Sequence, residues 1–135
     1  MLFLDTSTYS ALANGQNDIV SIIESEYNLA LPLPVIAELR YGFLKGSRPT
    51  QNEENLMRFL VQPHVEIVLP TINTTYKYAE MCLYCVKKAK VLSHNNLWIA
   101  AIAKENNGVL VTFDKDFEAL KAIFSDKLIV LNASL

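Results

Sequence analysis

The segment Met1-Leu2-Phe3-Leu4-Asp5 places a short apolar run directly before a carboxylate, and Val109-Leu110-Val111-Thr112-Phe113-Asp114 has a similar arrangement near the other end of the chain. Short apolar runs of this kind are typical of strands buried inside a parallel sheet. Asp5 and Asp114 each come just after such a strand, where the chain leaves the core. Because ligands of open α/β sheets bind outside the carboxyl ends of the strands, these two acids are candidates for a functional site.

Strand and helix patterns alternate along the rest of the chain. We expect further strands at residues 28–33, 65–69 and 128–131, and helices at residues 6–14, 18–27, 34–46, 49–61, 72–90 and 95–106. This alternation predicts an α/β fold, a three-layer α/β/α sandwich around a mostly parallel central sheet. The length of 135 residues fits a single domain over residues 1–135.

The helix expected at residues 72–90 has the clearest periodicity. Its apolar residues recur at steps of four, three, four and three, which places them in one stripe: Ile72, Tyr76, Ala79, Leu83 and Val86. Cys82 and Cys85 lie in the same helix. Because no strand precedes this C-x-x-C pair, packing is favoured over redox chemistry.

The composition limits the class of protein. Hydrophobic residues make up 51% of the chain and the formal net charge is −2, which argues against a domain that coats nucleic acid through a strongly basic surface. A nuclease with acids gathered around metal ions remains compatible with this charge. No signal peptide and no membrane-spanning stretch are recognisable, so we expect a soluble, cytoplasmic protein.

The candidate acids are Asp5, Glu38 and Asp114, which come from three separate elements. Carboxylates that are held close together repel one another, so a cluster of them suggests a bound cation. Hard divalent ions such as Mg²⁺ take oxygen ligands of this kind. For Asp5 or Asp114 alone, a helix N-cap or a turn is the more ordinary interpretation.

Four segments of the chain resemble, in order, the four motifs of PIN domains, the second in the form that VapC toxins have. They are Leu4-Asp5-Thr6-Ser7, Ala37-Glu38-Leu39-Arg40-Tyr41-Gly42, Asn95-Asn96-Leu97-Trp98-Ile99-Ala100-Ala101 and Val111-Thr112-Phe113-Asp114-Lys115-Asp116-Phe117. Each motif alone is weak evidence, but the four appear in the family's order over essentially the whole chain. This shared order favours one common functional site over separate helix caps.

The resemblance implies a role for each matching residue. Asp5 and Asp114 would be ligands of Mg²⁺ or Mn²⁺, with Asp116 as an alternative ligand, and Glu38 would bind the ion directly or through water. Thr112 would hydrogen-bond to a ligand or to a metal-bound water. The implied activity is that of an endoribonuclease toxin, which hydrolyses phosphodiester bonds in single-stranded or loop regions of cellular RNA, either transfer RNA or ribosomal RNA.

Asn96 departs from the family pattern, which has an aspartate at this position. The amide has the same shape as a carboxylate but is neutral, so it is a poorer ligand and cannot act as a base. It results either from a deliberate inactivating substitution, which the intact remaining motifs favour, or from natural weakening of the enzyme. We expect impaired catalysis, and the alternative function is a non-catalytic PIN-like module that binds RNA or protein.

The basic residues permit both functional and ordinary interpretations. Arg40 could pair with Glu38, could reach a substrate phosphate, or could belong to a surface ion pair. Lysines at the end of the helix expected at residues 72–90, Lys87, Lys88 and Lys90, suit a helix C-terminus but could also contact RNA phosphates.

The family resemblance also implies partners. VapC-like toxins bind a cognate antitoxin and form homodimers, so we expect both here, within a possible higher toxin–antitoxin assembly and without a membrane. Exposed aromatic side chains at Tyr9, Tyr41 and Phe43 are expected to offer an apolar surface to a partner.

Overall fold

The computed structural model describes residues 1–24 and 28–132, except for the side chains of Asp18 and Glu24. Five strands form one sheet in the order β3-β2-β1-β4-β5, and every neighbouring pair is parallel. The strands are β1 (Leu2–Leu4), β2 (Leu29–Pro32), β3 (Val65–Val68), β4 (Val109–Thr112) and β5 (Leu128–Val130). The predicted α/β fold with a parallel sheet is confirmed.

Helices connect each strand to the next. They are α1 (Thr6–Ala13), α2 (Asn17–Glu24), α3 (Leu33–Lys45), α4 (Pro49–Leu60), α5 (Ile72–Lys87), α6 (His94–Glu105), the 3₁₀ helix η1 (Lys115–Leu120), α7 (Lys121–Phe124) and the 3₁₀ helix η2 (Ser125–Lys127). The six helices expected from the sequence are present. The end of the helix expected at residues 18–27 lies outside the described residues.

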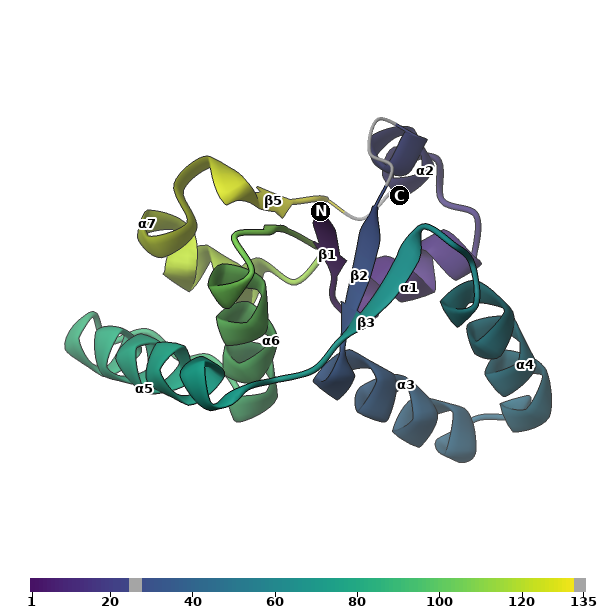
Figure 1. Cartoon of the computed structure of the whole chain (residues 1–135), viewed down its shortest axis with the longest axis horizontal. Coiled ribbons are helices and arrows are strands. Elements are labelled where there is room, and N and C mark those ends of the chain that lie inside the picture. The colour runs from purple at the N-terminus through teal and green to yellow at the C-terminus, as the bar shows by residue number, and fades with distance from the viewer. Residues whose placement is uncertain (25–27, 133–135) are drawn as a thin grey trace.

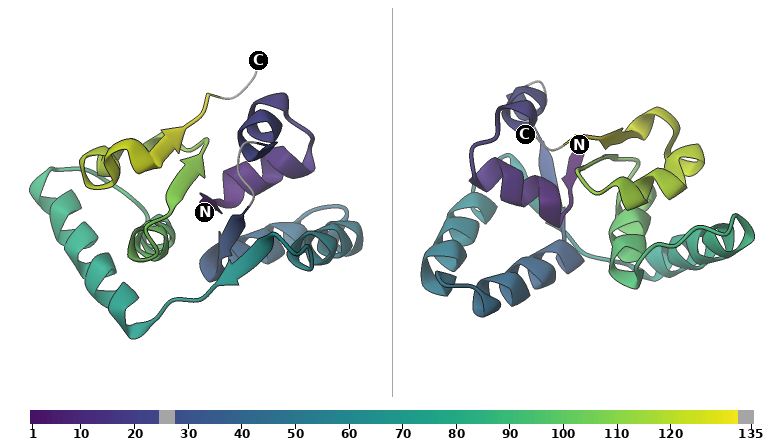
Figure 2. Two further views of the ribbon diagram at one scale, coloured as in Figure 1. Left: turned by 45° about the horizontal axis from the view of Figure 1, so that its top comes forward. Right: turned by 180° about the vertical axis from the view of Figure 1, so that it is seen from behind.

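The path of the chain through the sheet explains the three layers. From β1 the chain moves outward to β2 and β3, crosses back to β4 and continues to β5. Because crossovers between parallel strands are right-handed, this reversal puts α1–α4 on one face and α5, α6 and α7 on the other. Figures 1 and 2 show this arrangement, with the sheet between the two groups of helices. The strands β1 and β2 are buried at every residue because both of their faces are covered.

Gly108 brings β4 close to β1. A Cβ atom at this position would lie 2.2 Å from carbons of the Phe3 ring, which is fully buried, so a larger residue would force the strands apart. The next residue, Val109, donates its N–H to the carbonyl oxygen of Met1 at 3.1 Å. The register that follows pairs Leu4 with Val111 and so brings the carboxyl ends of β1 and β4 together.

The apolar stripe of α5 lies on the exposed face of the helix. Ile72 is 78% exposed, Tyr76 67%, Leu83 54% and Val86 76%. The buried positions of α5 are Thr74, Met81 and Cys85. Cys82 packs partly against the core and both cysteines are free thiols, in agreement with the packing role expected for the pair. Across the part of the chain that the structure describes, no helix has the length and apolarity to cross a membrane.

Candidate active site

Asp5 lies at the carboxyl end of β1, where it caps helix α1 and is only 3% exposed. Its Oδ1 accepts hydrogen bonds from the backbone N–H of Thr8 at 2.9 Å, from the Thr8 hydroxyl at 2.8 Å and from the Ser7 hydroxyl at 2.8 Å. Its Oδ2 accepts one from the Thr112 hydroxyl. These donors satisfy a buried carboxylate that would otherwise be costly. The capping interpretation is therefore correct for Asp5, and it coexists with a position at the sheet edge.

Hydroxyl groups connect Asp5 to the end of β4. Thr112, which is fully buried, donates to Asp5 and accepts from the backbone N–H of Asp114 at 2.9 Å. The Ser7 hydroxyl accepts from the backbone N–H of Phe113 at 3.0 Å. The family resemblance implied that Thr112 hydrogen-bonds to a metal ligand or to a metal-bound water, and its hydroxyl donates to Asp5, one of the candidate ligands. The sequence did not predict the role of the Ser7 hydroxyl, which joins the ends of β1 and β4.

Asp114 contacts Asn96 across the edge of the sheet. Asn96 lies in the first turn of α6, where its N–H donates to the Ser93 hydroxyl at 3.1 Å. Its Nδ2 donates to Oδ2 of Asp114 at 3.2 Å, and Oδ1 of Asp114 accepts the N–H of Asp116 at 2.9 Å. Asp114 thus caps η1 and also contacts Asn96 of the third motif. The Asp116 side chain is exposed.

Glu38 reaches the same edge of the sheet from α3. Its Oε1 accepts the hydroxyl of Thr6, the residue after Asp5, at 2.7 Å. Figure 1 shows α3 and α6 on either side of the carboxyl ends of β1 and β2. Two sets of contacts therefore meet at Asp5 and Thr6: one leads to Glu38, and the other leads through Thr112 to Asp114 and Asn96.

The donor set consists of oxygen atoms, which fits Mg²⁺ or Mn²⁺ in chemical type. Among the described residues, Oδ2 of Asp5 accepts a hydrogen bond only from Thr112, which leaves a lone pair for a further partner. Within residues 1–24 and 28–132, however, no three His, Cys, Asp or Glu side chains lie close enough together to hold a metal ion. Asn96, beside Asp114, has a neutral amide where the PIN-domain motif has an aspartate. The site therefore has one negative charge fewer than the family pattern.

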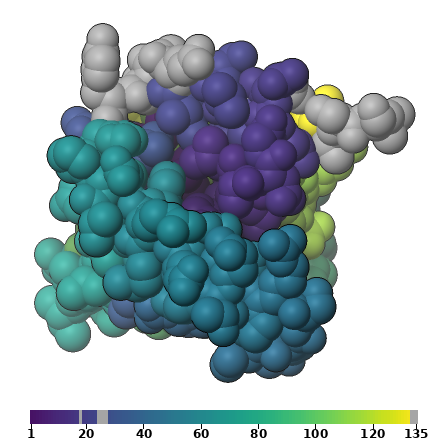
Figure 3. Space-filling view, turned by 90° about the vertical axis from the view of Figure 1, so that its right-hand side faces the viewer, coloured from purple at the N-terminus to yellow at the C-terminus, as the bar shows by residue number. Residues whose placement is uncertain are grey.

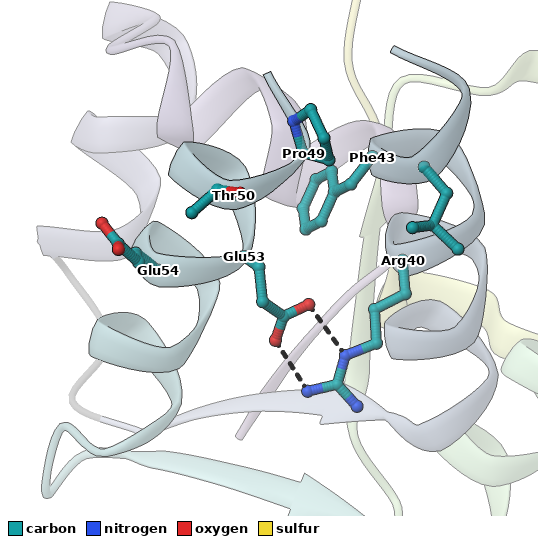
Figure 4. Close-up of a pocket in the computed structure, with 7 residues that line it drawn as sticks. Arg40, Phe43, Pro49, Thr50, Glu53 and Glu54 are labelled. Carbon is teal, nitrogen blue, oxygen red and sulfur yellow. Dashed lines mark hydrogen bonds and ion pairs between the residues drawn. The ribbon is translucent and has the colours of Figure 1, made fainter. Parts of the chain in front are cut away.

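Of the three possibilities left open for Arg40, the structure shows the surface ion pair, and its partner is Glu53 rather than Glu38. Its Nε and one terminal nitrogen donate to the two carboxylate oxygens of Glu53 on α4, at 3.1 and 2.9 Å (Figure 4). Residues two positions apart leave a helix in nearly opposite directions, so Glu38 can face the sheet edge while Arg40 faces α4. The pair lines a cavity of about 400 Å³ between α3 and α4.

The expected aromatic surface is only partly present. Tyr41 is 64% exposed, as predicted, but Tyr9 is buried, with its ring edge-on to Phe59 at 5.2 Å between centroids. Tyr9 belongs to α1, which packs against α3, and its ring contacts Phe59 of α4. Figure 3 shows the purple surface of the first residues next to the blue and teal surface of later helices. Phe43 is half-buried and lines the cavity beside Arg40.

Comparison with known proteins agrees with this geometry. The model of the PIN domain family matches residues 2–123. Ribonuclease VapC2 of Rickettsia felis is 29% identical over 102 residues, 75% of each chain, and ribonuclease VapC5 of Mycobacterium tuberculosis is 25% identical over 126 residues, 93% of this chain and 92% of the relative.

Solved structures extend the similarity to the whole fold. The crystal structure of Rickettsia felis VapBC2 bound to a DNA fragment from its promoter contains a chain that matches with a TM-score of 0.78, 27% identity and 98% coverage of both chains. VapBC-1 of nontypeable Haemophilus influenzae also matches with a TM-score of 0.78, at 22% identity and 98% coverage of both chains. With the family match over most of its length and all four motifs in place along the sheet edge, the chain belongs to the PIN-domain family.

Proposed function

We propose that the chain is a VapC-type endoribonuclease that depends on Mg²⁺ or Mn²⁺ and that Asn96 weakens its activity. The observation that carries the proposal is the contact between Asn96 and Asp114, which stands in the same hydrogen-bonded cluster as Asp5. The names of the two curated relatives, both VapC ribonucleases, support the same activity.

Each residue of the cluster has a distinct part in this proposal. Asp5 and Asp114 supply anionic oxygens, and Glu38 supplies a third from α3. Thr112 orients both aspartates, because its hydroxyl donates to Asp5 and accepts the N–H of Asp114. When bound, a divalent ion supplies the positive charge that polarises the scissile phosphate and activates the attacking water.

The proposed partners are an antitoxin, an RNA substrate and a second copy of the chain. The solved relative of Rickettsia felis is a VapBC complex on promoter DNA, which supports an antitoxin and a larger assembly here. We further propose that the RNA is cut in single-stranded or loop regions of transfer or ribosomal RNA.

A non-catalytic RNA- or protein-binding module is the second candidate. Asn96 favours it, because an amide cannot replace the charge or the basicity of the missing carboxylate. The nuclease proposal is preferred because the remaining polar contacts of the cluster are intact.

The test compares Asn96→Asp with the double variant Asp5→Ala/Asn96→Asp on single-stranded RNA, with Mn²⁺ and with EDTA. We expect metal-dependent cleavage by the first variant and its loss in the second. Mapping the 5′ ends of cellular RNA after brief expression of Asn96→Asp would identify the cleaved class of RNA. No cleavage by a folded Asn96→Asp variant would favour the non-catalytic module, whereas cleavage that persists in EDTA would contradict the proposed dependence on Mg²⁺ or Mn²⁺.

A further inference from the structure

A polar cavity of about 520 Å³ lies beside the candidate active site. It is formed by the connection between α5 and α6 together with η1 and the start of α7. Its lining residues are Lys90, Val91, Lys115, Asp116, Glu118, Ala119 and Lys121.

The three lysines of this cavity have no ion-pair partner among the described residues. Among the described residues, no hydrogen bond or ion pair engages the ammonium groups of Lys90, Lys115 and Lys121, although two carboxylates line the same cavity. Lys90 is held by a turn in which Ala89 has a φ of 53° and the N–H of Lys90 donates to the carbonyl oxygen of Cys85 at 2.9 Å. Three unpaired cations around one cavity form a site for anionic oxygens.

The cavity begins at the residue that follows Asp114 in the chain. Asp116 lines it, and the N–H of Asp116 donates to Asp114 at 2.9 Å. The segment that carries Lys115 and Lys121 is anchored by Phe117 and Leu120, which are fully buried. The backbone that carries Lys115 and Lys121 is therefore held in place, and Lys115 directly follows Asp114 in the chain.

We propose that this lysine cavity binds the phosphodiester backbone of the RNA strand next to the bond that is cut. The proposal rests on the nuclease function proposed above. A chain with a net charge of −2 cannot attract RNA by its overall charge, so it needs a local basic site near its acids. Val91, 89% exposed at the same cavity, offers an apolar contact to a sugar or a base.

The experiment measures binding of a fluorescent single-stranded oligoribonucleotide by anisotropy, in EDTA, over a series of salt concentrations. The variants Lys90→Gln, Lys115→Gln and Lys121→Gln are compared with Lys45→Gln, a control with the same charge change at the end of α3, where Lys45 lies over the Tyr41 ring. Each cavity variant should lower the salt slope of log K by about 0.7 and weaken binding about fivefold at 0.1 M salt. Lys115→Arg, which keeps the positive charge, should retain the salt slope and the affinity of the native chain.

Equal salt slopes for the cavity variants and the Lys45→Gln control would overturn the proposal, as would a native chain that does not bind RNA. Cleavage by Asn96→Asp separates this failure from that of the nuclease function. If this variant cuts RNA and the lysine changes leave binding intact, only the lysine cavity is refuted. If it neither cuts nor binds RNA, both proposals fail.

Discussion

The carboxylate of Asp5 has four hydrogen-bond donors among the described residues, two of them the backbone N–H and the hydroxyl of Thr8. The Thr8 hydroxyl shares its single proton with the carbonyl oxygen of Val111, 2.6 Å away. The Asp5 side chain ends β1, caps α1 and faces the residues of the fourth motif. Local sequence predicts the first two properties, because an aspartate after an apolar strand and before a helix is a common arrangement. The third property, the contact of Asp5 with the fourth motif, comes from the hydroxyl of Thr112. The position of this hydroxyl depends on the pairing of β1 with β4.

Replacing Thr112 with valine should destabilise the fold. The change keeps the shape of the side chain but leaves the N–H of Asp114 without its partner and removes a donor from Asp5. Because the site is buried, we expect a loss of about 1–3 kcal/mol in the free energy of unfolding, measured with urea. Thr112→Ser, which keeps the hydroxyl, should lose less, and equal losses for the two variants would contradict this role of the hydroxyl.

Asn96→Asp should make stability depend on metal. The amide now donates to Asp114 at 3.2 Å, whereas a carboxylate would place two like charges at that distance. In EDTA and low salt we expect a lower Tm than that of the native chain. Saturating Mn²⁺ should reverse this loss, since a ligand at a hundred times its Kd stabilises by about 2.7 kcal/mol. A Tm that is unaffected by Mn²⁺ in this variant would show that position 96 does not contribute to metal binding.

At the scale of the elements, the strands and helices could be predicted because their apolar periods are clear. The order of the strands could not, since it depends on crossovers that bring β1 beside β4 from more than a hundred residues away. The exposed face of α5 could not be predicted either. Its helical period is correct, but the face that packs inward carries Thr74, Met81 and Cys85 and leaves the more apolar stripe outside.

The exposed stripe of α5 is a candidate for the contact between two copies of the chain. A surface of this kind is unusual in a protein that stays monomeric. We expect Tyr76→Glu/Leu83→Glu to shift the proposed dimer toward monomer in light scattering at micromolar concentration, with the fold unchanged by circular dichroism. Tyr41→Glu, on the exposed side of α3, is the matched control. A dimer that resists the double change, or a native chain that is strictly monomeric, would contradict this role of the stripe.

At the scale of the whole molecule, three layers of structure bring four distant motifs to one edge of the sheet. The sequence predicted this edge from Asp5 and Asp114, but not the direction of Arg40, because its partner Glu53 belongs to another helix. The lysine cavity was also beyond a sequence argument, since Lys90 and Lys115 come from opposite sides of α6 in the chain. Side-chain partners across elements depend on packing, which local patterns do not contain.

The rate of RNA cleavage tests most directly whether residue 96 is part of a catalytic oxygen cluster. The measurement compares the native chain with Asn96→Asp on the same single-stranded RNA, at Mn²⁺ concentrations that saturate each protein. We predict that the variant cuts at least about 10²-fold faster, the low end of what a positioned acid–base group contributes. Equal rates for the two folded, metal-loaded proteins would show that residue 96 lies outside the catalytic cluster.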